Sequence, residues 1–204
     1  QAERSTGGRC QGPCLRLLSY MAVAARRVAG VYDRLLGSAP LRVKSASSAL
    51  IAGFGDNLCQ NAVEQRESYD FARTARFMLV GGVLVGPTLH AWYEVLATRI
   101  PGATAMAAAK RVALDQGVFA PVFVPVFTMS LAAVEGSQAA LHDAATRLRK
   151  DYVDLLSGNI AIWTPAMFIS FWRVPPSYRV LFANIVGIAW NTYASWVIGK
   201  RVTA

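Results

Sequence analysis

The sequence has few charged residues. Asp, Glu, Lys and Arg make up 16% of its 204 residues, whereas an average soluble domain has about 25%. Hydrophobic residues make up 54%, and the mean hydropathy is +0.33. A soluble protein of this composition would need many polar outer helices, and few are available. The deficit in charge therefore predicts a protein that has lipid as its solvent.

Cysteine and histidine are scarce as well. The three cysteines, Cys10, Cys14 and Cys59, are too few and too irregularly spaced for a disulfide framework or a zinc site. We interpret them as ordinary thiols, with a Cys10–Cys14 pair as the alternative. The two histidines, His90 and His142, do not combine with a nucleophile and an orienting acid. We expect no enzymatic activity, catalytic residue, metal site or cofactor.

Acidic residues are fewer than basic ones. The chain has 12 Asp and Glu residues and 21 Lys and Arg residues, so its net charge is +9. The basic residues occur singly or in pairs beside apolar runs, without the basic stripe and interleaved aromatic residues of a nucleic-acid interface. Such positive charge favours an anionic lipid surface and fits a mitochondrial address better than a secretory one. We expect anionic lipids, and no nucleic acid, as partners.

The chain begins with an arginine-rich, acid-poor stretch. We interpret residues 1–16 as an N-terminal extension, a remnant of the targeting segment of a longer precursor, with a composition typical of disorder. A neighbouring protein is the expected means of ordering it. Residues 17–204 are expected to form a single helical membrane domain.

Long apolar runs are what the sequence has in place of charge. Crossing the ~30 Å hydrocarbon core takes roughly 20 residues. The expected spans lie near 43–64, 72–98, 103–134 and 177–199. Residues 158–172 are too short to span comfortably and form a half-helix before the break at Pro175 and Pro176. The predicted fold is an all-α membrane bundle of about four transmembrane helices with a broken last segment.

Two further segments have amphipathic spacing. Over 17–37 and 138–156, apolar residues recur every three or four positions with charged residues opposite. Both are predicted to be helices that lie in the membrane interface. Trp92 and Tyr93, followed by charged residues, indicate an aromatic belt at one membrane face.

Glycine and proline interrupt the predicted spans. The pair Gly82-x-x-x-Gly86 predicts close helix packing, and Pro87 predicts a kink. Pro121 and Pro125 lie within one span and free backbone carbonyls, which a neighbouring helix or water must satisfy.

Polar residues within the apolar runs are the candidate functional residues. They are Asp56, Gln60, Asp115, Gln116, Arg179, Asn184 and Asn191. Polar groups at membrane depth face a bundle interior or a cavity. They either line an aqueous path or pair with one another and hold the helices in register, and the sequence leaves both interpretations open.

The order of several short motifs carries a resemblance. These motifs are Gly55-Asp56-x-x-x-Gln60, Gly86-Pro87-x-x-His90-x-Trp92-Tyr93, Asp115-Gln116, Trp163-x-Pro165, Val174-Pro175, Arg179-x-x-x-x-Asn184 and Trp190-Asn191. In this order and spacing the chain resembles the Mpv-seventeen / peroxisomal-membrane-protein-twenty-two family, small integral proteins of inner mitochondrial and peroxisomal membranes.

The resemblance implies a compact bundle, conventionally counted as four transmembrane helices, without established enzymology. The residues to which it assigns structural roles are Gly55, Pro87, His90, Trp92, Tyr93, Trp163, Pro165, Pro175 and Trp190. The chain departs from the family in one place. After Trp-x-Pro the family usually carries Gln and then Asn, where this sequence has Met167 and Ser170. Two amide side chains are lost, which favours a scaffold over a pore.

The expected function is that of an accessory structural subunit of a large complex of the mitochondrial inner membrane, such as a respiratory complex or ATP synthase. Its partners would be other subunits of that complex. The alternative is a pore or channel-like protein that controls small-solute permeability of the inner mitochondrial or peroxisomal membrane. In both cases we expect a multi-pass membrane protein.

Overall fold

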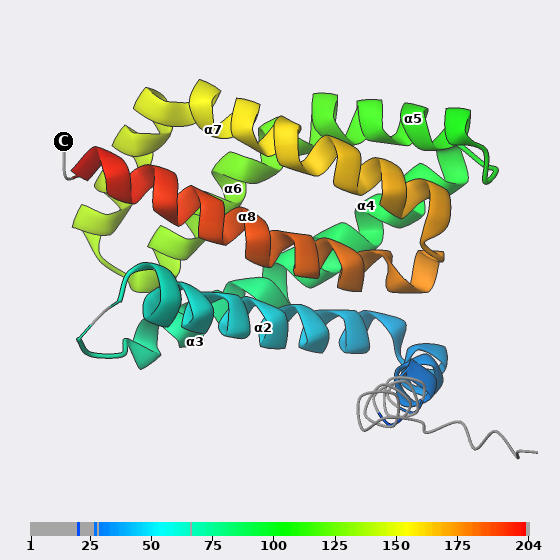
Figure 1. The fold of residues 1–204 in the computed structure, drawn as a ribbon, viewed down its shortest axis with the longest axis horizontal. Coiled ribbons are helices and arrows are strands. Elements are labelled where there is room, and N and C mark those ends of the chain that lie inside the picture. Colours follow the sequence, from blue (N-terminus) through cyan, green and yellow to red (C-terminus); the bar gives the residue numbers. More distant parts are fainter. Residues whose placement is uncertain (1–19, 21–26, 28, 66, 203–204) are drawn as a thin grey trace, which may run out of the picture. The chain divides into compact units, whose positions relative to one another are not determined.

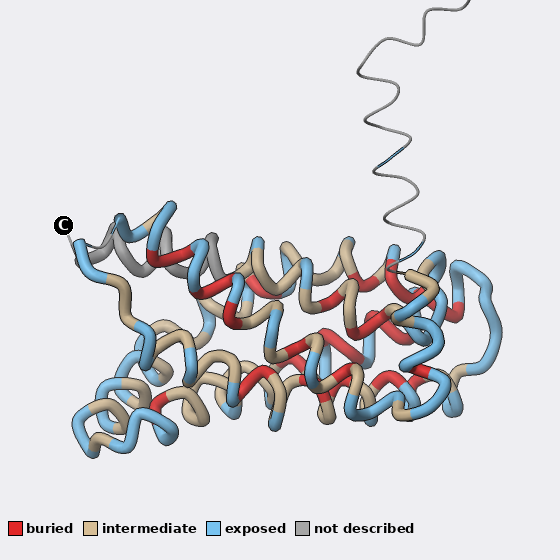
Figure 2. Tube along the Cα trace, turned by 90° about the horizontal axis from the view of Figure 1, so that it is seen from below, coloured by how far each residue is buried: buried red, intermediate tan, exposed pale blue. Residues whose placement is uncertain are grey.

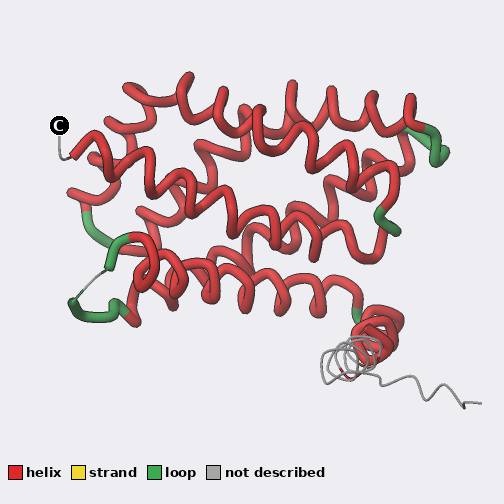
Figure 3. The backbone as a smooth tube through the Cα atoms, viewed as in Figure 1, coloured by secondary structure: helices red, strands yellow, loops and turns green. Residues whose placement is uncertain are grey.

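The computed structural model describes residues 20, 27, 29–65 and 67–202, and for 191–202 it describes the backbone alone. Within these ranges the ordered elements are helical and no strand occurs (Figure 3). The extension predicted at 1–16 lies outside the described residues. The helix predicted over 17–37 is described continuously only from residue 29, and it runs to residue 38.

The chain divides into two units, Gln1–Ala39 and Pro40–Ala204. The second unit holds the bundle (Figure 1). Its α-helices are α2 (Pro40–Leu58), α3 (Phe71–Val80), α4 (Gly86–Arg99), α5 (Ala105–Leu114), α6 (Ala120–Glu135), α7 (Gln138–Arg173) and α8 (Arg179–Val202). Its other turns are the π-helical η1 (Cys59–Val63), η2 (Gly81–Val85) and η3 (Asp115–Phe119), and the 3₁₀ turn η4 (Pro176–Tyr178).

Within the described residues, two helical segments are long and apolar enough to cross a membrane. They are Ala105–Glu135, which joins α5, η3 and α6, and Gln138–Arg173, which is α7. The predicted break near Pro175 is confirmed, because α7 ends at Arg173 and α8 begins at Arg179. The count of four transmembrane helices and the interfacial position of the amphipathic segments stay predictions.

Helix α7 corrects one predicted boundary. The sequence predicts an interfacial helix over 138–156 and a separate half-helix over 158–172, but Gln138–Arg173 is one continuous helix. Gly158 lowers helix propensity by only about 1 kcal/mol, and packing of α7 against α5, α6 and α8 outweighs it. Its 36 residues extend over about 54 Å. Since the hydrocarbon core is ~30 Å thick, part of α7 extends beyond it.

The prolines coincide with π-helical turns. Pro87 and Pro121 each follow a π turn by two residues. A proline ring clashes with the carbonyl four residues earlier, and here that carbonyl lies inside the widened turn. Pro125 removes the usual donor for the Pro121 carbonyl, and the Tyr152 hydroxyl of α7 donates to this oxygen at 2.9 Å. The prediction that a neighbour must satisfy a freed carbonyl is confirmed there.

Helix α2 packs closely against the η2 and α4 segment. A methyl group on Gly86 would lie 2.7 Å from the Cα of Ser45, and one on Gly82 would lie 3.1 Å from the Cβ of Ala49. Neither position leaves room for a side chain without a shift of α2. The close packing predicted from Gly82-x-x-x-Gly86 is therefore confirmed, and it places α2 beside the cavity described below.

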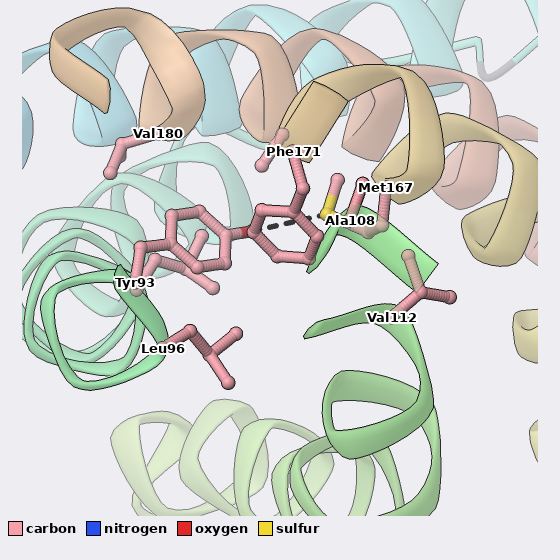
Figure 4. Close-up of a cluster of buried hydrophobic side chains, with 9 residues drawn as sticks. Tyr93, Leu96, Ala108, Val112, Met167, Phe171 and Val180 are labelled. Atoms are coloured by element: carbon pink, nitrogen blue, oxygen red, sulfur yellow. Dashed lines mark hydrogen bonds between the residues drawn. The ribbon is translucent and has the colours of Figure 1, made fainter. Parts of the chain in front are cut away.

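Buried stretches of the chain are red in Figure 2. A core cluster of apolar side chains joins α4, α5, α7 and α8 (Figure 4). Its members are Leu89, Tyr93, Leu96, Ala108, Val112, Met167, Phe171, Val180 and Ala183. The Tyr93 hydroxyl donates to the Met167 sulfur at 3.4 Å, and the Tyr93 and Phe171 rings meet edge to face at 5.4 Å. The core cluster fixes one end of the bundle.

Tyr93 corrects the predicted aromatic belt. The sequence places Trp92 and Tyr93 at a membrane face, but Tyr93 is 6% exposed and belongs to the core cluster. Trp92 is half-buried and donates a hydrogen bond to Asp115. The face of α4 that carries Tyr93 packs against other helices, so lipid headgroups do not reach its ring.

Replacing Gly86 by alanine is expected to lower stability by about 1–3 kcal/mol, because the added methyl group meets the α2 backbone. Thermal unfolding in detergent measures the effect. Gly187→Ala is the matched control, since a methyl group there meets nothing within 4 Å. Equal melting temperatures for the two variants would contradict the close packing.

Candidate functional site

A cavity of about 880 Å³ lies within the bundle, lined by α2, α3, α4, α6, α7 and α8. Its rim includes Asp143 and Arg147, which are exposed, and its inner wall includes the buried Asp115 and Asn159. Residues of the core cluster, among them Tyr93, close the other end. The cavity therefore reaches from exposed residues in the first turns of α7 to buried residues of the core cluster.

A first polar group connects α2 and η1 to α3. The buried Asp56 carboxylate accepts hydrogen bonds from Gln60 Nε2 at 2.8 Å and from the Thr74 hydroxyl at 2.6 Å. Arg73 Nε lies 2.8 Å from the other Asp56 oxygen, and a second Arg73 nitrogen lies 2.7 Å from Glu64. Asp56 and Gln60 are four residues apart and share one face. This group holds two antiparallel helices in register.

Gln60 also anchors the start of α3. Its side-chain oxygen accepts from the Asp70 backbone N–H at 2.8 Å, and its Nε2 donates to the Asp70 carbonyl at 3.1 Å. Asp70 is the N-cap of α3, and its carboxylate accepts from the Arg73 N–H at 2.8 Å. A capping residue bound in this way fixes where the helix begins.

A second polar group lies at η3. Asp115 accepts from Trp92 Nε1 at 2.8 Å and from Gln116 Nε2 at 2.8 Å. On another wall of the cavity, Asn184 of α8 donates to the Ser48 hydroxyl of α2 at 2.7 Å. The Trp92–Asp115 and Asn184–Ser48 bonds connect elements that are far apart in the sequence.

Among the described residues, two buried polar atoms of cavity-lining residues have neither a hydrogen-bond nor an ion-pair partner, whereas Asp56 Oδ1 is paired with Arg73. They are the side-chain oxygen of Gln116 and the indole nitrogen of Trp163. One is an acceptor and the other a donor. A buried polar group without a partner costs about 1–3 kcal/mol, and in native proteins it is commonly explained by a bound water, ion or ligand. Both residues line the cavity but the two atoms themselves are buried, so a solute would reach this unused hydrogen-bonding capacity once the side chains turn toward it.

The charges that line the cavity are mainly negative. Among the described residues, seven carboxylates and three arginines line it. The carboxylates are Asp56, Asp70, Asp115, Glu135, Asp143, Asp151 and Asp154, and the arginines are Arg73, Arg76 and Arg147. Acidic walls of low dielectric raise the local concentration of cations and lower that of anions.

The structure separates the residues that the sequence grouped together. Asp56, Asp115, Gln116 and Asn184 line the cavity, and Gln60 lies directly behind Asp56. Arg179 lies elsewhere, with backbone carbonyls of the α7–α8 connection. The side chain of Asn191 lies outside the described residues. Among the family positions, Trp163 and Trp190 line the cavity and Gly55 packs against Ile188.

Thr74, Lys44 and Arg111 are polar residues whose contacts the sequence did not reveal. Thr74 bonds to Asp56, and Lys44 Nζ lies 2.9 Å from His90 Nδ1. Arg111 donates to three backbone carbonyls. For Lys44 and Arg111 the only available signal is a charge beside an apolar run, which does not identify the partner, and for Thr74 the sequence offers no signal.

Comparison with known proteins identifies the family. The model of the Mpv17 / PMP22 family matches residues 132–195. Protein sym-1 of Neurospora crassa is 36% identical over 173 residues, which cover 83% of this chain and 98% of that protein. The chain belongs to the Mpv17 / PMP22 family. The resemblance drawn from the order of its motifs is thereby confirmed.

Relatives within the Mpv17 / PMP22 family also locate the protein. The mitochondrial inner membrane protein Mpv17 of Homo sapiens is 35% identical over 167 residues, 81% of this chain and 94% of the relative. Its counterpart in Danio rerio is 32% identical over 171 residues, 83% of this chain and 96% of the relative. No solved structure matches the chain. With its two apolar helices, this family member is a protein of the mitochondrial inner membrane.

Asp56→Ala is expected to lower stability by about 3–5 kcal/mol, because it removes one partner of a buried ion pair and leaves Gln60 and Thr74 without their acceptor. Chemical unfolding in detergent measures it. Asp143→Ala, an exposed carboxylate on the cavity rim, is expected to change stability by less than about 0.5 kcal/mol. Similar losses in both variants would exclude a special role for Asp56.

Proposed function

We propose that this inner-membrane protein binds a small polar solute, cationic or neutral, in the cavity of its helical bundle. The observation that carries the proposal is the pair of unpartnered polar atoms, Gln116 Oε1 and Trp163 Nε1, on residues that line the cavity. A solute that donates to one and accepts from the other relieves the free energy of two unpaired buried groups.

The charge of the cavity supports the class of solute. Carboxylates outnumber arginines along its walls, so a cation or a neutral molecule is favoured over an anion. Arg73 and Arg76 are already paired with Asp56 and Glu135, at 2.8 Å each, which lowers their attraction for an anionic solute.

The closed inner end supports a binding site over an open pore. The core cluster fills the bundle between the cavity and the α4–α5 and α7–α8 connections. Passage across the membrane would require Tyr93, Met167 and Phe171 to separate. The pore interpretation thus depends on a second conformation, whereas solute binding does not.

The solute-binding proposal predicts a class-dependent thermal shift. We expect the purified protein in nanodiscs to be stabilised by small organic ammonium or amide compounds and not by carboxylates of similar size. In the double variant Trp163→Phe with Gln116→Leu, the apparent Kd for these compounds is expected to rise at least tenfold. The reason is that about 1.4 kcal/mol of hydrogen bonding is removed.

Ser157→Ala serves as the control for that experiment, because Ser157 is exposed and does not line the cavity. A double variant that binds as tightly as the parent protein would contradict the site. So would an equal response to carboxylates and ammonium compounds.

A second candidate function is that of an accessory structural subunit of a larger inner-membrane complex. It is favoured by the two positions at which the family resemblance expects amides. Met167 is fully buried in the core cluster, and the Ser170 hydroxyl is buried with no hydrogen-bond partner among the described residues. Apolar packing of Met167 in place of an amide makes this part of the bundle suited to a fixed scaffold.

The subunit proposal predicts the size of the native species. Mild detergent extracts of mitochondrial inner membranes, run on a native gel, are expected to show the protein in a species several times larger than its 22.0 kDa chain. A soluble-marker ladder and a denaturing second dimension give the control. Migration only as a small free species would reject this role and leave the solute site unaffected.

A further inference from the structure

Positive charge is concentrated at one end of the unit Pro40–Ala204. This end holds the start of α2 and the α4–α5 and α7–α8 connections (Figure 1). We call it the cationic end. Its basic residues are Arg42, Lys44, Arg99, Lys110, Arg111, Arg173 and Arg179, and its single acidic residue is Glu94. Such an excess creates a strong positive potential at the membrane surface.

Two buried arginines form the inner part of the cationic end. Arg111 donates to the carbonyls of Ile100 at 2.7 Å and Gly102 at 2.8 Å, and reaches that of Phe171 at 3.4 Å. Arg179 donates to Val174 at 3.2 Å and to the same Phe171 carbonyl at 3.4 Å. Both guanidinium groups bind carbonyl oxygens at the ends of α4 and α7, where helices leave acceptors free.

Within the part of the chain that the structure describes, Glu94 is the one carboxylate that interacts with Lys44 and Arg179, and it forms no salt bridge with either. Arg111 and Arg179 form no ion pair there, and the buried Lys44 contacts the His90 ring instead of an acid. The carbonyls and the imidazole satisfy hydrogen bonds but carry no formal negative charge. A buried cation is costly unless an opposite charge lies nearby.

Exposed cations surround the buried ones. Lys110 directly precedes Arg111 in the sequence. Arg99 precedes Ile100, and Arg173 lies two residues after Phe171; Arg111 donates to the carbonyls of Ile100 and Phe171. The Arg173 guanidinium lies 4.1 Å from the centroid of the Trp172 ring, and Trp172 is 39% exposed. An exposed tryptophan beside an arginine is typical of the level of lipid headgroups.

At the opposite end of the bundle, arginines are paired with carboxylates. There Arg73 and Arg76 form ion pairs with Asp56, Glu64 and Glu135 at 2.7–2.8 Å. The first half of α7 contains both acidic and basic residues. The excess of positive charge therefore belongs to one end and does not follow from the net charge of the chain alone.

We propose that the cationic end is a binding site for the phosphate headgroup of an anionic phospholipid in the leaflet it faces. The headgroup supplies negative charge that Glu94 alone cannot provide for seven basic residues, and the acyl chains lie along the apolar outer surface of α5 and α7. The proposal is independent of the solute cavity, whose rim is at the other end of the bundle.

Titration of lipid into the purified protein tests the proposal. The probes are phosphatidylglycerol and phosphatidylcholine, each added in the same detergent, with native mass spectrometry and thermal unfolding as the two readouts. We expect saturable binding and stabilisation with phosphatidylglycerol only. The double variant Lys110→Gln with Arg173→Gln is expected to weaken that binding on the order of 30-fold.

The matched control is Arg149→Gln with Lys150→Gln, which removes the same two kinds of charge from exposed positions on α7. It is expected to bind phosphatidylglycerol like the parent protein. Equal weakening in both variants would overturn the proposal in favour of net charge, and unchanged binding in both would also overturn it. Inorganic phosphate is added in parallel, and full competition by it would assign the cations to a soluble anion.

Discussion

The requirement that polar groups be paired away from water controls this bundle. Helix ends and prolines leave carbonyl oxygens without donors, and side chains from other helices supply them. Tyr152 of α7 serves Pro121 of α6, and Arg111 and Arg179 serve the ends of α4 and α7. Each of these contacts joins two elements, so satisfying the backbone also sets how the helices are placed.

The π-helical turns contain both candidate-site residues and the backbone carbonyls that face prolines. Gln60 lies in η1, and Asp115 and Gln116 lie in η3, so three of the polar residues that matter occupy widened turns. A π turn shifts the side chains that follow it around the helix by comparison with a regular α-helix, and such turns are frequent at functional sites. In this protein they turn amide and carboxylate groups inward while η2 and η3 make room for prolines.

Much of the fold follows from local pattern, and the site follows only in part. Apolar runs predict where α2, the α5–α6 segment and α8 begin and end. Small residues predict the close approach of α2 to Gly86. The continuity of α7 is not predicted in this way, because packing on three neighbours overrides Gly158. The residues Asp56 and Asp115 were found as charges in apolar runs.

The partners of these residues could not be found in the same way. Trp92 binds Asp115 across 23 positions, and Arg179 binds nearby carbonyls instead of a carboxylate. A spacing rule on one helix identifies which residues share a face, but it does not identify the helix that this face meets. Those pairings are set by the tertiary arrangement, so they required the structure.

The bond between Asn184 and Ser48 links the first and last helices of the unit across 136 positions. Helix α2 packs against both α3 and α8, so its inner face is complete only when the final helix is in place. During synthesis almost the whole chain must therefore be made before α2 finds its last neighbour. A chain that ends before α8 leaves Ser48 and the cavity wall beside it exposed.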